Sequence, residues 1–148
     1  TGRITGTLTP DASQNGPFEI TVTADDGNGG TVTDTFILTS SNTAPVAQDD
    51  QRETAENVVA IGNVLANDAD GGNDRDDLVV SQVDGSTAAI GQPVTGSNGG
   101  QFTIGGDGGY AFNPGEDFDD LADGESRVTA VVYQVSDGQG GVDTATLS

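Results

Sequence analysis

The densest group of oxygen-bearing side chains lies between residues 56 and 74. Glu56 and Asn57 come first, a short apolar stretch from Val58 to Ala66 follows, and the segment ends in Asn67-Asp68-Ala69-Asp70-Gly71-Gly72-Asn73-Asp74. Where the chain turns out of a strand at Gly71-Gly72, the carboxylates of Asp68 and Asp70 can face one cation. Ca²⁺ accepts roughly six to eight oxygens in irregular geometry. The pattern therefore predicts a structural calcium site rather than a reaction centre, with solvated turn carboxylates as the alternative.

The overall charge is strongly negative. The chain has 24 acidic residues against four arginines, no lysine and no histidine, which gives a formal net charge of −20. Nucleic acids and anionic membranes are poor partners for such a surface, because both attract basic residues. Self-repulsion at this charge opposes folding, so salt or bound divalent cations should favour the folded state. The chain has no cysteine, so no disulfide can provide that stabilisation.

The composition also argues against catalysis. Without His, Cys or Lys the chain lacks the usual pairs of nucleophile and base, and a phosphate-binding loop would need basic residues near its glycines. Glu116 and Asp119 could act as a glycosidase pair, but any acidic β-protein offers many such pairs. We therefore expect that the protein is not an enzyme. The stretch from Val58 to Ala66 is too short to span a bilayer, so no membrane insertion is expected.

The elements that would position these residues are short strands. Runs rich in Val, Ile, Thr, Phe and Tyr alternate with period two between Gly and Asp turns, and no window has a convincing helical stripe. The predicted strands cover residues 18–24, 31–39, 78–83, 101–104, 128–135 and 142–147. Several strands without helices between them predict an all-β, Ig-like or cadherin-like antiparallel β-sandwich.

An internal repeat sets the domain boundaries. The segment from Ile20 to Gly30 returns as the segment from Val131 to Gly141, at an offset of 137 − 26 = 111 residues, which is the size of one sandwich domain. The chain is thus predicted to hold the C-terminal part of one module at residues 1–40, a linker at 41–46 and a complete module at 47–148. The partial module has too few strands to be stable unless another chain or the next module completes its sheet.

The complete module is long enough to bury a core. The candidates are apolar residues at alternate strand positions: Val64, Leu78, Val80, Phe102, Ile104, Tyr110, Phe112, Val131, Tyr133, Val135 and Leu147.

Two families resemble this chain. Thr1-Gly2-Arg3-Ile4-Thr5-Gly6-Thr7, Gly16 to Ala24 and Asp26-Gly27 resemble the second half of a dystroglycan-type cadherin-like module of Ig type. Asn42 to Ala47, Val64 to Asp70 and Tyr133 to Gly141 resemble, in order and with matching intervals, a VCBS-type bacterial cadherin-like repeat. The resemblance implies tandem modules within very large secreted or surface-attached bacterial proteins, including RTX-type adhesins.

The pattern is also similar to animal cadherin repeats, in which acidic and amide side chains hold calcium at domain junctions. Carried over residue by residue, this resemblance implies the ligands Asn42, Glu56, Asp68, Asp70 and Asp137, with Asp26 as the matching residue of the partial module. The linker keeps Asn42 alone of the cadherin Asp-x-Asn-Asp-Asn string.

The expected function is that of a calcium-binding, calcium-stiffened extender in a large bacterial adhesin that mediates cell adhesion. Its location would be extracellular, secreted or attached to the cell surface, and its partners would be neighbouring tandem modules, with glycans or cell-surface receptors as further candidates. The alternative is a carbohydrate-binding module. Sugar platforms need stacked Trp or Tyr, whereas Trp is absent and Tyr110 and Tyr133 occupy positions suited to a core.

Overall fold

The computed structural model describes residues 16–70 and 77–148. The motif at Thr1 to Thr7 and the Gly71-Gly72 turn lie outside the described residues. The described strands are β1 (Phe18–Asp25), β2 (Thr31–Leu38), β3 (Ala60–Asn63), β4 (Val79–Val83), β5 (Pro93–Thr95), β6 (Gln101–Ile104), β7 (Gly109–Asn113), β8 (Val131–Ser136) and β9 (Val142–Leu147). One 3₁₀ turn, η1 (Thr87–Ala89), is the helical element among them. No described helix is long and apolar enough to cross a bilayer.

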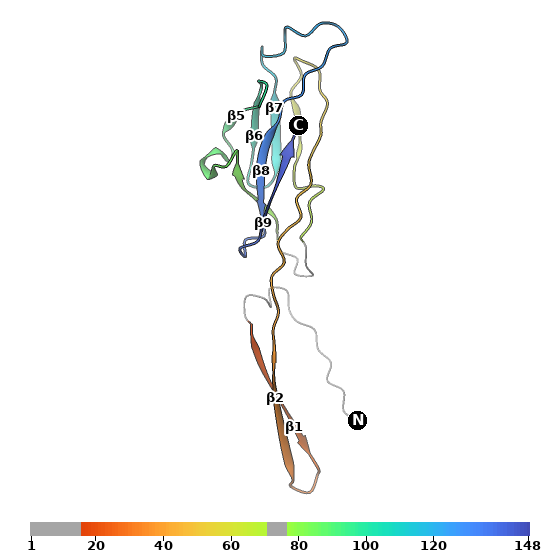
Figure 1. The fold of residues 1–148 in the computed structure, drawn as a ribbon, viewed down its shortest axis with the longest axis vertical. Helices are drawn as coiled ribbons and strands as arrows, with labels where there is room; N and C mark the ends of the chain where they lie inside the picture. Colours follow the sequence, from red (N-terminus) through yellow and green to blue (C-terminus); the bar gives the residue numbers. More distant parts are fainter. Residues whose placement is uncertain (1–15, 71–76) are drawn as a thin grey trace.

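The strands after residue 46 form two antiparallel sheets, with the orders β3-β7-β6-β5 and β4-β8-β9. Figure 1 shows this sandwich as a separate body from the β1–β2 hairpin, which extends beyond one end of it. The predicted all-β, Ig-like sandwich is confirmed. Three short strands were not predicted, because β5 starts at a proline, β7 starts at a glycine and β3 lies in an apolar stretch that does not alternate.

The core lies between the two sheets. Nine of the predicted core residues are buried, and Leu78 and Tyr110 pack half-buried at its margin. Ala60, Val83, Phe118 and Ala145 are also buried, and sequence patterning did not single them out. Phe112 stacks at 4.5 Å between ring centroids on Phe102, its cross-strand neighbour, and makes an edge contact of 6.0 Å with Phe118. Such aromatic pairs add stabilisation beyond the area they bury.

The segment before β3, at residues 46–52, is hydrogen-bonded to the sandwich at several points. Val46 exchanges two backbone hydrogen bonds with Ala69, and Asp50 pairs in parallel with Leu147. The Tyr133 side chain is 1% exposed, and its hydroxyl contacts the Gln48 carbonyl at 3.1 Å and the Asp50 carboxylate at 2.8 Å. The sandwich core thus holds residues 46–50 as part of the module.

The β1–β2 hairpin pairs eight residues on each strand, from Phe18 opposite Leu38 to Asp25 opposite Thr31. Its turn repeats the β8–β9 turn. Asp26 Oδ1 accepts the N–H groups of Asn28 and Gly30, at 2.8 and 2.9 Å. Asp137 Oδ1 accepts those of residues 139 and 141, at 2.7 and 2.9 Å. The internal repeat read from the sequence therefore corresponds to two hairpins of the same local structure.

Candidate metal centre at the linker end of the sandwich

The β8–β9 turn lies where the chain enters the sandwich. Asn42 Nδ2 donates a hydrogen bond of 2.8 Å to Asp137 Oδ2, across 95 residues of sequence. We call the end of the sandwich that holds Asn42 and this turn the linker end. The opposite end, where Ser148 lies after β9, is the C-terminal end (Figure 1).

Asp137 is almost completely enclosed at the linker end, with 4% of its surface exposed. Burial pushes its pKa upward, but the N–H groups of Gln139 and Gly141 and the Asn42 amide outweigh that effect, so the net pKa is lowered. The carboxylate is therefore held ionised. A Cβ on Gly141 would lie 2.8 Å from the Ala44 Cα and even closer to the Asp137 carboxylate, so the turn and the incoming chain are in close contact.

Asp68 and Asp143 both accept hydrogen bonds from the backbone of the incoming segment. Asp143 Oδ2 accepts the Ala47 N–H at 2.9 Å, and Asp68 Oδ1 accepts the N–H of the next residue, Gln48, at 2.8 Å. Burial raises the pKa of Asp68, and the charges of Asp50 and Asp143 raise it further against the Gln48 hydrogen bond. The surroundings of Asp68 therefore disfavour its negative charge, and a bound cation would stabilise that charge.

Several shielded side-chain oxygens lie at this end. Among the described residues, Asn42 Oδ1 and Asp68 Oδ2 are buried and have no hydrogen-bond partner. Asp70 Oδ1 and Gln139 Oε1 are likewise shielded from solvent. Buried polar atoms normally have partners, and orphaned ones indicate strain, a water or an ion. Hard oxygen donors of this kind suit Ca²⁺.

The carboxylates alone do not make a metal cage. No group of three or more Asp, Glu, His or Cys residues in ranges 16–70 and 77–148 is arranged to hold an ion. A cation at the linker end would therefore need amide or carbonyl oxygens in addition to carboxylates, as Ca²⁺ commonly uses. Asn42 provides one such oxygen.

Two predicted ligands lie elsewhere. Glu56 is exposed in a turn that follows the pairing of Arg52 with Ser148, which places it at the C-terminal end, opposite Asp68 and Asp137. Asp26 lies in the β1–β2 turn, at the other end of the hairpin from Leu38 and the linker. The structure therefore does not bring Glu56 or Asp26 together with Asp68 and Asp137. Their assignment as calcium ligands stays a prediction, because sequence matching does not reveal at which end of a strand a residue falls.

Asp143 also belongs to this region, and sequence reasoning missed it. Asp143 lies in β9 on the same face as buried Ala145 and Leu147. A carboxylate at an inward-facing position of a strand requires a buried partner, and this was the signal that could have identified it.

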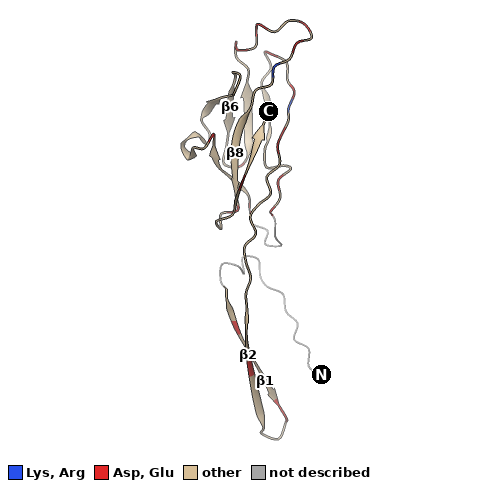
Figure 2. Cartoon of the chain, in the orientation of Figure 1, with Lys and Arg blue, Asp and Glu red and all other residues tan. Residues whose placement is uncertain are grey.

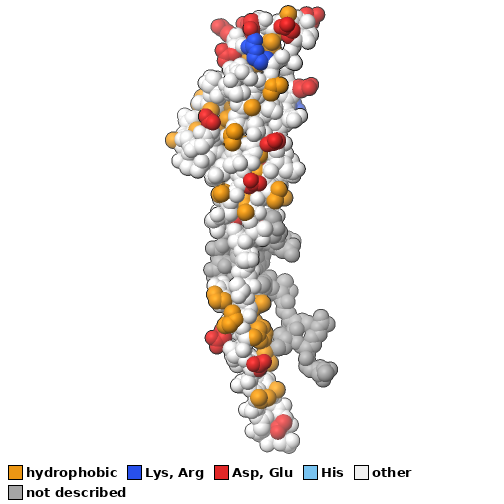
Figure 3. Space-filling model, viewed as in Figure 1, with side chains coloured by type: hydrophobic (Ala, Val, Ile, Leu, Met, Phe, Trp, Pro, Cys, Tyr) orange, Lys and Arg blue, Asp and Glu red, His pale blue; other side chains and the backbone are white. Residues whose placement is uncertain are grey.

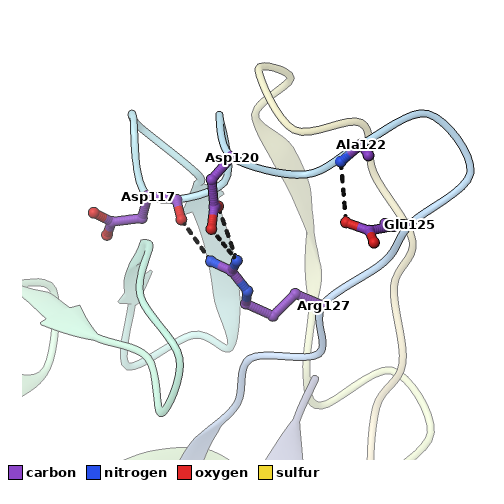
Figure 4. Close-up of polar contacts among 5 residues, drawn as sticks. All are labelled: Asp117, Asp120, Ala122, Glu125 and Arg127. Atoms are coloured by element: carbon purple, nitrogen blue, oxygen red, sulfur yellow. Dashed lines mark hydrogen bonds and ion pairs between the residues drawn. The ribbon is translucent and has the colours of Figure 1, made fainter.

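The acidic run at residues 116–120 has a structural explanation. Arg127 Nη2 contacts both Asp120 oxygens at 2.7 and 2.8 Å, and Nη1 donates to the Asp117 carbonyl at 2.8 Å (Figure 4). Glu125 caps the Ala122 N–H within the same loop. The Arg127 contact lowers the pKa of Asp120. Figure 2 places this loop and the described arginines at the C-terminal end.

A comparison with protein families identifies the sandwich. The family model for the bacterial Ig domain matches residues 42–148, which is more than two thirds of the chain. The chain belongs to the bacterial Ig domain family. The match starts at Asn42, so the residues of the predicted linker that contact the β8–β9 turn fall within the bacterial Ig domain. A search of curated proteins found no match.

Proposed function

We propose that the chain is an extender segment of a large bacterial surface or secreted protein, in which bacterial Ig domains follow one another end to end. The observation that carries this proposal is the position of the two ends of the domain. Asn42 lies beside the β8–β9 turn, whereas Ser148 pairs with Asp50 and Arg52 beyond the other end of β9. A chain that enters and leaves at opposite ends adds length with every domain.

The repeated hairpin supports this arrangement. The β1–β2 hairpin matches β8–β9 at an offset of 111 residues, so Ser148 corresponds to residue 37, shortly before the predicted linker at 41–46. The strand direction gives a rise of about 20 Å over the six residues of β9 alone. In this proposal the array lies outside the cell, holds an adhesive region away from the cell surface and has a mechanical role.

Tandem arrays test the extender proposal. Joining Ser148 directly to Leu38 of a second copy reproduces the natural sequence relation, and two-, three- and four-domain arrays can be built in this way. We expect the maximum dimension from small-angle X-ray scattering to rise by the same increment with each domain. A matched array with a Gly-Ser insert before Asn42 should be more flexible and show a broader distribution of interatomic distances in the scattering data. Arrays that grow only in cross-section would contradict the proposal.

Calcium binding at the linker end is the second part of the proposal. Asn42, Asp68, Asp70 and Asp137 are the predicted ligands that the structure brings to that end, and the orphaned oxygens of Asn42 and Asp68 are what supports them. Asn42 now points its Nδ2 at Asp137, and rotation of the amide would present Oδ1 instead. A bound Ca²⁺ would supply positive charge between these donors and tie the incoming chain to the sandwich.

Thermal unfolding tests this part. We expect millimolar CaCl₂ to raise the Tm of the full chain and MgCl₂ at equal ionic strength to raise it less, because Mg²⁺ needs a smaller octahedral site. Asp68→Asn and Asp70→Asn should remove most of the calcium increment. Asp84→Asn, in the turn after β4, is the matched control and should keep it. Equal increments in all three variants would show diffuse screening instead of a site.

A further inference from the structure

The β1–β2 hairpin has one apolar face that nothing in the described part of the chain covers. In the paired register this face carries seven apolar side chains and Asp34, namely Phe18, Ile20, Val22, Ala24, Val32, Phe36 and Leu38. Val32 is 68% and Phe36 43% exposed. Figure 3 shows hydrophobic side chains gathered over this hairpin. The opposite face is mainly threonine.

The same face is covered in the repeated hairpin. The offset of 111 places Ile20 on Val131 and Phe36 on Leu147, and both of these β8 and β9 residues are at most 4% exposed. In the sandwich they belong to one buried cluster with Ile104 and Phe112 of the opposite sheet. The hairpin therefore presents a core-type face.

The outer edge of β1 is open as well. β8 uses the corresponding edge to pair with β4, in a register that runs from Val79 opposite Ser136 to Val83 opposite Tyr133. β1 pairs with β2 alone among the described strands. An open edge beside an apolar face is the usual condition for strand addition.

We propose that this face and edge form a docking surface for a half-sandwich of the kind that residues 42–128 provide, placed before β1 in the same polypeptide. The occupant has two features. It lends a β4-type strand to the edge of β1, and it covers the face with an antiparallel sheet of alternating Phe, Ile and Val side chains.

Asp34 adds a third requirement. It lies opposite Val22, on the same face, where β9 has buried Ala145. A covered carboxylate needs a hydrogen-bond donor. In the complete domain, Asp143 of the same β9 face obtains one from the Ala47 N–H. The occupant must accordingly direct an N–H group at Asp34.

A second copy of the chain is a poor occupant. Two hairpin faces packed together would bury two Asp34 carboxylates without a donor, and each chain has a net charge of −20. We expect the full chain to sediment as a monomer at micromolar concentration. A dimer that Phe36→Asp abolishes would overturn the proposal in favour of self-association.

A hybrid chain tests the docking surface directly. Joining residues 42–128 to Phe18, in place of residues 1–17, keeps the repeat register because 129 − 18 = 111. In hydrogen-exchange mass spectrometry we expect the β1 and β2 amides to exchange at least about 100-fold more slowly in the hybrid than in the original chain. Phe36→Asp should abolish this protection. Ile37→Asp, on the opposite face, should keep it.

Asp34 provides a second variant. Asp34→Ala restores the residue type of β9 and should increase protection of the hybrid, because the new occupant is matched to alanine at this position. Hairpin amides that stay unprotected in both the hybrid and its Asp34→Ala form would overturn the proposal. Equal loss of protection in Phe36→Asp and Ile37→Asp would do the same.

Discussion

Asp137 shows how one side chain organises the linker end. Its Oδ1 closes the β8–β9 turn through two backbone N–H groups, and its Oδ2 binds the Asn42 amide. The sequence indicated both residues, through the Asp-Gly turn and through a family resemblance. It could not show that Asp137 would be buried, because that depends on the path of residues 42–46 across the turn.

Removing the Asn42 amide should destabilise the domain. Asn42→Ala leaves one oxygen of a buried carboxylate without its donor, and hydrogen bonds to charged groups contribute about 1.5–3 kcal/mol. We expect a loss of that order in the free energy of unfolding from urea denaturation. Asn57→Ala, exposed in the turn at the C-terminal end, is the control and should change it by less than about 0.5 kcal/mol. Equal effects would show that the Asn42 contact contributes nothing specific.

The partly buried acids of the sandwich should respond to pH in opposite ways. Burial raises the pKa of Asp68 and Asp50 above 3.8, so their stabilising effect is present below that pH and is lost as pH rises through the raised folded values. Asp137 and Asp143 have lowered pKa values, and their contribution is lost as pH falls below 3.8 through the folded values.

Protons should therefore compete with calcium at Asp68. We expect the calcium increment in Tm to shrink on acidification while the pH is still above the ordinary aspartate value of 3.8. Scanning calorimetry from pH 7 to pH 4, with and without CaCl₂, measures this. An increment that stays constant over that range would exclude Asp68 as a ligand.

At the scale of elements, period-two alternation predicted the strands that have one buried and one exposed face. β6, β8 and β9 follow it closely. It failed for β3, which runs into Gly62, because a Cβ there would lie 2.7 Å from the Tyr110 ring on the paired strand. The sequence did not show where Glu56 would lie, for a related reason. Alternation says which face a side chain occupies, but which end of the sandwich Glu56 reaches depends on the topology.

The contact between the β8–β9 turn and the incoming chain should be intolerant of a side chain. We expect Gly141→Ala to lower the free energy of unfolding by about 1–3 kcal/mol, because its Cβ would overlap Asp137 and lie 2.8 Å from the Ala44 Cα. Gly106→Ala is the matched control, since its Cβ would meet nothing closer than 3.9 Å. Urea denaturation of both variants provides the measurement, and equal losses would contradict this packing argument.

At the scale of the whole molecule, the net charge of −20 on the chain would produce repulsion between neighbouring units of the proposed array. The described arginines, Arg52 and Arg127, are at the C-terminal end beside the acidic loop at residues 116–125, so acidic residues outnumber them there too (Figure 2). Composition predicted this repulsion, but it could not predict that the described arginines would lie at one end of the domain.

Salt and calcium should stabilise the chain by separable routes. We expect NaCl between 10 mM and 500 mM to raise the Tm of both the original chain and Asp68→Asn, because screening of surface charges needs no specific ligand. Calcium at fixed ionic strength should raise the Tm of the original chain alone. A salt response that disappears in Asp68→Asn would show that the two effects have one origin.

The parallel pairing of the segment at residues 50–52 with the end of β9 has a consequence under tension. Asp50 and Arg52 share three backbone hydrogen bonds with Thr146 and Ser148, and pulling on an array draws the two strands in opposite directions along their length. These bonds lie across the direction of pull, so they are loaded in shear and must break together rather than one after another. In the proposed array, this pairing of the first segment with the last strand is therefore the element that would bear the load.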